Sequence, residues 1–134
     1  MINDKTLSRL VDISCSLIHD IESDSKHVSF IVRKNKILSF GVNKSLKTHP
    51  IANKLNYRFG TIHSELSAIL RAKKSAEFKN VTLVNLRLSA LTIRTGIPVF
   101  RNSMPCPSCV KLIMANPEIK QVVYTNDEGW VLND

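Results

Sequence analysis

The stretch "RNSMPCPSCVKLIMANPEIKQVVYT", residues 101–125, decides the fold, because it predicts a helix followed directly by a strand. The helix is expected to begin at about Pro107, since proline is favoured in the first helical turn, and to run to Asn116 before Pro117. The run "IKQVVYT" that follows is rich in β-branched and aromatic residues, which is typical of a strand.

The rest of the chain also alternates helices with strands. Hydrophobic spacing and turn residues predict these elements: a helix over residues 4–21, a hairpin over 27–42, a long connection over 43–60, a helix over 61–78 with Thr61 as its N-cap, a strand over 81–89, a second hairpin arm over 92–100, and a last short strand after the turn in "NDEGWVL". Such alternation implies crossover connections and a sheet covered on both faces. We therefore predict one layered α/β domain over residues 1–134.

Two cysteines lie three positions apart in "PCPSC", at the start of the predicted helix. Cys106 and Cys109 therefore fall on one helix face, and a helix N-terminus lowers the pKa of a thiol. Two thiolates suit Zn²⁺, which takes ligands from Cys, His and carboxylates. His63 is the best third ligand, because it also stands in the first turn of a predicted helix. The C-x-x-C alone would also fit a redox pair or half of a structural zinc site.

The fourth coordination position has no obvious protein ligand. The remaining candidates stand in no paired spacing: Cys15, His19, His27 and His49. Three protein ligands and an open position are typical of a catalytic zinc, which lowers the pKa of a bound water to about 7. Glu65 stands two residues after His63. A carboxylate placed there could take a proton from the water and deliver it to a substrate nitrogen.

Together, "HSE" and "PCPSC" resemble the zinc signature of the cytidine deaminase superfamily, H-x-E followed by P-C-x-x-C. The resemblance implies that His63, Cys106 and Cys109 bind one zinc ion per chain, with water or hydroxide as the fourth ligand. It also implies that Glu65 is the general acid and base. Asn43, in "GVN", resembles the asparagine with which the family contacts the base.

The same resemblance implies a three-layer α/β/α sandwich around a mixed five-stranded sheet. Its last strand should be antiparallel, because "NDEGWVL" leaves no room for a helix. This tail and the insertion Ser89 to Met104 resemble the free-nucleoside and blasticidin-type enzymes. The first ligand, however, is His63, where the nucleoside enzymes typically carry cysteine.

The implied reaction is hydrolysis of a C–N bond in a cyclic amidine, which releases ammonia from a small aminated heterocycle. A cytosine-type nucleoside or nucleotide is the favoured substrate. Two alternatives stay open: a deaminase of a base within single-stranded RNA or DNA, and an inactive, zinc-stabilised interaction domain. The family resemblance also implies a homo-oligomer.

The net charge of +8 favours anionic partners such as nucleotides or nucleic acid. Four cations on the long connection could contact a phosphate: Lys44, Lys47, Lys54 and Arg58. No basic tail points to nucleic acid, so a small substrate is preferred. No apolar run approaches the roughly 20 residues of a membrane span, and the N-terminus lacks an apolar signal region, so we expect a cytoplasmic protein without membrane contacts.

Overall fold

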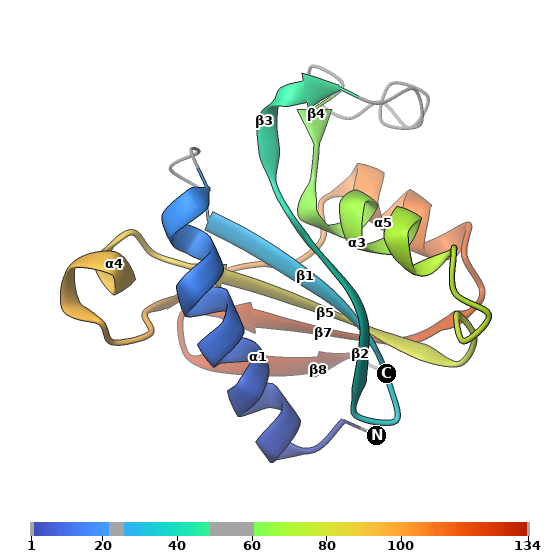
Figure 1. Ribbon diagram of the computed structural model, residues 1–134, viewed down its shortest axis with the longest axis horizontal. Coiled ribbons are helices and arrows are strands. Elements are labelled where there is room, and N and C mark those ends of the chain that lie inside the picture. Colours follow the sequence, from blue (N-terminus) through green and yellow to red (C-terminus); the bar gives the residue numbers. More distant parts are fainter. Residues whose placement is uncertain (1, 22–25, 49–60, 134) are drawn as a thin grey trace.

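The computed structural model describes residues 2–21, 26–48 and 61–133. Its main sheet is mixed, with the strand order β2-β1-β5-β7-β8 (Figure 1). In addition, β6 pairs with β5. The only parallel pair along this order is β5 with β7, and β8 returns antiparallel to β7. The strands are β1 Lys26–Arg33, β2 Lys36–Val42, β5 Val81–Leu88, β6 Phe100–Arg101, β7 Ile119–Asn126 and β8 Gly129–Asn133. The mixed sheet and the antiparallel last strand confirm the predicted fold.

Helices cover both faces of this sheet. On one face lies α1, Asp4–Leu17, which continues as the 3₁₀ turn η1, Ile18–Asp20. On the other face lie α3, Ser64–Ala72, and α5, Pro107–Met114, next to each other (Figure 1). Among the described residues, no helix is both long and apolar enough to cross a bilayer.

The two central strands are buried on both faces, which explains their near-continuous apolar sequences. In β1, Phe30 packs into the core beneath α1, whereas Ile31 packs into the core beneath α3 and α5. The register places Ser29 opposite Asn85, and His27 opposite Arg87. Because side chains alternate along a strand, these four side chains share the face of Ile31, which is covered by α3 and α5.

The start of α3 differs from the prediction. His63, and not Thr61, is its N-cap, with an extended backbone at φ −81° and ψ 158°. Thr61 instead belongs to the short strand β4, Thr61–Ile62, which pairs with β3, Lys44–Thr48. The strand β3 was not predicted either, because the pairing between residues far apart in sequence leaves no strong local signal.

The predicted hairpin arm over residues 92–100 was largely wrong. Residues Leu91–Thr95 form the short helix α4, which ends at Gly96 with a positive φ of 71°. Local hydrogen bonds hold this turn: the Thr92 hydroxyl accepts from the backbone N–H of Val99, and the Thr95 hydroxyl donates to the backbone oxygen of Leu91. Only β6 pairs with β5 as a hairpin arm would.

Candidate metal centre and active site

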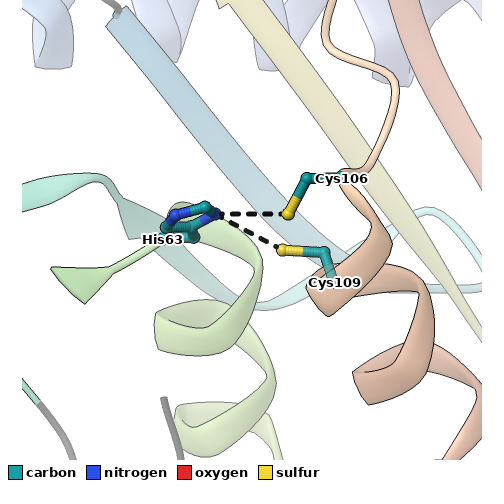
Figure 2. Close-up of side chains that lie close together, drawn as sticks. All are labelled: His63, Cys106 and Cys109. Carbon is teal, nitrogen blue, oxygen red and sulfur yellow. Dashed lines mark hydrogen bonds between the residues drawn. The ribbon is translucent and has the colours of Figure 1, made fainter. Parts of the chain in front are cut away.

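The starts of α3 and α5 bring three possible metal ligands together (Figure 2). His63 is the N-cap of α3, and Cys106 is the N-cap of α5, with Pro107 as the first residue of that helix. The Nδ1 atom of His63 lies 3.7 Å from the Sγ atom of Cys106 and 3.6 Å from that of Cys109. Both helix N-termini therefore face one point between the three side chains.

This geometry fits zinc. Zn–S bonds of about 2.3 Å and Zn–N bonds of about 2.0–2.1 Å, at tetrahedral angles, separate a sulfur ligand from a nitrogen ligand by about 3.6 Å. Both measured separations agree with this value, and all three ligand atoms lie within 4.8 Å of one another. Two thiolates and one imidazole form a donor set that zinc prefers, and it leaves the fourth tetrahedral position to a non-protein ligand.

The thiol of Cys106 has a lowered pKa, which favours the thiolate form that binds a metal. A hydrogen bond from the thiol of Cys109 is the largest cause that lowers the pKa of Cys106, and the hydrogen bond with His63 adds to it, so that the pKa is about 4. Burial lowers the pKa of His63, but the hydrogen bond with Cys106 and the charges of Glu65 and Cys106 outweigh it, so that the pKa is raised. In the metal-free protein, His63 and Cys106 therefore stabilise each other's charged forms.

Glu65 lies beside this group and is buried, with 5% of its surface exposed. Its carboxylate accepts a hydrogen bond from the Ser64 hydroxyl at 3.0 Å. It is also close enough for its charge to act on the pKa values of both His63 and His27. A buried carboxylate whose charge acts on a metal-ligand residue is a group that can take up and release protons beside the metal centre.

A buried polar network fixes Ser64 on the sheet. The hydroxyls of Ser64 and Ser29 lie 2.7 Å apart, and Ser29 donates to the side-chain oxygen of Asn85. Asn85 in turn donates from Nδ2 to the backbone oxygen of Ser103, at 2.9 Å. Since Ser103 precedes Cys106 by three residues, the network ties the start of α3, the central strands and the approach to α5 into one unit.

Asn43 lies directly after β2, next to the start of β1. Its side-chain oxygen accepts from the backbone N–H of His27 at 3.0 Å, and its own backbone N–H donates to the backbone oxygen of His27 at 3.4 Å. This double contact fixes the end of β2 against the start of β1. Asn43 is therefore held near His27. The charges of Glu65, His63 and Cys106 all act on the pKa of His27.

The other candidate ligands and phosphate contacts lie away from the metal centre or outside the described residues. Cys15 lies on α1, on the opposite face of the sheet, and His19 is exposed in η1. His49, Lys54 and Arg58 lie outside the described residues, as do the side chains of Lys44 and Lys47.

Sequence reasoning considered His27 only as a possible fourth ligand and missed Arg87 opposite it, and both side chains lie near the metal centre. They stand opposite each other on β1 and β5, and the charge of Arg87 acts on His27 together with the charges of the metal-centre residues. An arginine near the end of the predicted strand over residues 81–89 was a signal that could have drawn attention to this position.

Comparison with solved structures supports the same architecture. The dCMP deaminase from the cyanophage S-TIM5, in complex with dCMP and dUMP, matches with a TM-score of 0.59 and 18% sequence identity, over 94% of this chain and 85% of that chain. The apo form of that enzyme matches with a TM-score of 0.49 and 19% identity, over 88% and 83%. No curated protein gives a significant sequence match. At this identity, the first match shows a shared fold.

A family sequence model also matches the part of the chain that contains the metal centre. The sequence model described as the cytidine and deoxycytidylate deaminase zinc-binding region matches residues 4–126. This range contains the His63, Cys106 and Cys109 group, whose geometry fits zinc, together with Glu65. We conclude that the chain belongs to the cytidine and deoxycytidylate deaminase family, whose members are zinc-dependent hydrolytic deaminases.

Proposed function

We propose that this protein deaminates a cytosine-type nucleoside or nucleotide by hydrolysis, with zinc held by His63, Cys106 and Cys109 and with Glu65 as the general acid and base. The observation that carries the proposal is the buried Glu65 carboxylate beside three donor atoms with zinc-binding geometry. The similarity to a dCMP deaminase in complex with dCMP and dUMP supports a pyrimidine substrate.

The roles of the residues follow from their positions. His63, Cys106 and Cys109 would hold zinc, which supplies water activated for attack at neutral pH. Glu65 would take a proton from the attacking water and give it to the ring nitrogen next to the amine-bearing carbon. It would then carry the second proton to the amine, which leaves as ammonia while the ring carbon keeps the oxygen as a carbonyl. The hydrogen bond from Ser64 holds Glu65 in position for both transfers.

The proposal predicts that Glu65→Gln loses deamination and keeps zinc. Zinc-loaded protein would be tested for ammonia release from cytosine, deoxycytidine, dCMP, the corresponding adenine and guanine compounds, and a cytosine-containing single-stranded oligonucleotide. We expect release from a small cytosine compound, and a loss of at least about 100-fold in Glu65→Gln, because glutamine cannot move the proton. Zinc content, measured by mass spectrometry of the metal, should remain one ion per chain.

Glu77→Gln is the matched control. Glu77 is a half-exposed carboxylate that pairs with Lys36, at 3.0 Å, away from the metal centre. This variant should retain full activity. Release only from the oligonucleotide would replace the small-substrate assignment with a nucleic-acid deaminase. Equal activity of Glu65→Gln and wild type would refute the role of Glu65, and zinc binding without any ammonia release would favour the inactive interaction domain.

A further inference from the structure

A row of basic side chains crosses the sheet next to the metal centre. The register places His27 of β1 opposite Arg87 of β5, and Arg87 opposite Arg101 of β6. Residues directly opposite one another in antiparallel strands point to the same face of the sheet. Arg101 follows Phe100, which packs into the core on the α1 face, so Arg101 points to the other face, where α3 and α5 lie.

This basic row lies next to the part of the sheet that contacts the metal centre. Ser29 and Asn85 belong to that part, since Ser29 contacts Ser64 at the start of α3 and donates to Asn85. His27 and Arg87 each stand two residues further along the same strands, which corresponds to about 7 Å. A substrate whose base lies at the zinc ligands would therefore extend its distal end over this row.

Among the described residues, no carboxylate forms an ion pair with either of these two arginines. In the described ranges the only ion pair joins Lys36 to Glu77, at the far end of β1. Arg87 donates to the backbone oxygen of Asn102 at 3.4 Å, and Arg101 donates to the backbone oxygen of Phe100 at 3.1 Å. Arg87 and Arg101 are both partly buried as whole residues. Partly buried arginines bonded only to backbone carbonyls keep their full charge and further donors for an anion.

We propose that Arg87 and Arg101, with His27 beside them, form the subsite for the phosphate of a nucleoside monophosphate substrate. Guanidinium groups bind phosphate through paired, charge-assisted hydrogen bonds. The N-termini of α3 and α5 meet at the neighbouring metal centre and add a favourable field for negative charge near it. This inference rests on the proposed function and deepens it, because it assigns the substrate class as a nucleotide over a nucleoside.

His27 would act as a neutral hydrogen-bonding group in this subsite. Burial is the largest cause that lowers the pKa of His27, and the charge of Arg87 lowers it further, against the opposing charge of Glu65. Near neutral pH the imidazole is therefore uncharged and can donate one N–H. The charge recognition would come from the two arginines.

The test is the binding of dUMP and deoxyuridine to the zinc-loaded protein, measured by calorimetry. Both compounds carry the uracil product base and differ only in the phosphate, so their comparison isolates the subsite without requiring turnover. We expect dUMP to bind at least about 10-fold more tightly than deoxyuridine. Arg87→Gln and Arg101→Gln should each weaken the binding of dUMP about 10-fold, as expected for the loss of one charge-assisted contact. Each variant should leave the affinity for deoxyuridine within about twofold of the wild-type value.

Two controls separate the subsite from a general disturbance. Arg94→Gln changes an exposed arginine on α4 and should alter neither affinity. His27→Ala should weaken the binding of dUMP more than the binding of deoxyuridine. His19→Ala, which changes an exposed histidine in η1, should leave both affinities unchanged. An equal loss for dUMP and deoxyuridine in the Arg87 and Arg101 variants would overturn the proposal, and so would no loss for either ligand.

Wild-type protein alone gives an independent measurement if a variant fails to fold. Binding of dUMP should weaken as salt is raised, whereas binding of deoxyuridine should not, because only the former involves a phosphate charge. Salt-insensitive binding of dUMP would refute the subsite. Tighter binding of a single-stranded oligonucleotide than of dUMP, lost in the same arginine variants, would overturn the nucleotide assignment in favour of a nucleic-acid backbone.

The outcome does not depend on catalysis. If no compound releases ammonia but dUMP still binds through Arg87 and Arg101, the phosphate subsite stands and the proposed function fails. If deoxycytidine is deaminated but dUMP binds no more tightly than deoxyuridine, the proposed function stands and the subsite fails.

Discussion

Cys106 shows how its surroundings change the chemistry of a single side chain. The thiol lies at the start of α5, accepts a hydrogen bond from Cys109 and contacts His63, and its pKa is lowered to about 4. Cys15, by contrast, has a raised pKa because of burial and the nearby charge of Asp12. The same residue type is therefore a thiolate at one site and a protonated thiol at the other near neutral pH.

We predict that iodoacetamide modifies Cys106 of the metal-free protein faster than Cys15 at about pH 6. Cys106 is almost fully ionised there, because this pH lies above its pKa, whereas a thiol with the ordinary value of 9.0 is ionised to about 0.1%. The lower intrinsic nucleophilicity of a low-pKa thiolate offsets most of this advantage, which leaves a difference of several-fold. Peptide mass spectrometry would measure both rates. Zinc should protect Cys106 and leave Cys15 unchanged, and equal rates in the metal-free protein would contradict the prediction.

The contact between β2 and α3 determines where the metal centre forms. A Cβ atom at Gly41 would lie 2.6 Å from the backbone nitrogen of Ala68, 2.6 Å from the backbone oxygen of Ser64 and 2.7 Å from the Cβ atom of Ser67. Only glycine allows the strand and the helix to approach this closely. Since His63 and Glu65 flank Ser64, this contact also sets the position of the candidate site.

We predict that Gly41→Ala both destabilises the protein and weakens zinc binding. The added methyl group must push the first turns of α3 away from the sheet, at a cost of about 1–3 kcal/mol in the free energy of unfolding. Urea denaturation and zinc competition with a chromophoric chelator would measure the two effects.

Gly96→Ala provides the control for this substitution. Gly96 has a positive φ of 71°, but a Cβ atom there would have no neighbour within 4 Å. The control should lose some stability through backbone strain and keep its zinc affinity. Unchanged zinc affinity in Gly41→Ala would contradict the proposed coupling between this contact and the metal centre.

The described part of the chain has two apolar cores, one on each face of the sheet. The α1 face is packed with residues such as Leu10, Phe30 and Val84, and the opposite face with residues such as Leu66, Leu83 and Leu112. Cys109 is itself part of the second core and is fully buried. A metal that joins His63 to Cys106 and Cys109 would therefore link α3 to α5 over the second core.

We predict that chelation of zinc lowers the melting temperature without unfolding the protein at room temperature. Zinc at 100-fold above its dissociation constant adds about 2.7 kcal/mol to the free energy of unfolding. For a chain of this size, that corresponds to a shift of roughly 10 °C. Circular dichroism during heating, with and without chelator, would measure it. Complete unfolding on chelation at room temperature would mean that the two apolar cores do not support the fold by themselves.

The sequence by itself determined the features that local signals encode. Helical spacing, strand composition and the short tail predicted the order of most elements, and "HSE" with "PCPSC" predicted the residues of the metal centre, because each motif stands at a helix start. The same local reasoning failed at Thr61 and over residues 92–100, where pairing with distant strands and capping by nearby hydroxyls decided the outcome.

The tertiary structure decided which distant residues meet. Nothing local to β1, β5 or β6 specifies that His27, Arg87 and Arg101 form one row, because that row depends on the register of three strands that are far apart in sequence. The close approach at Gly41 has the same origin, whereas the contact between Asn43 and His27 lies across the hairpin that the sequence predicted. Register is fixed by the burial of whole strand faces, so the surroundings of the metal centre appear only once both cores are packed.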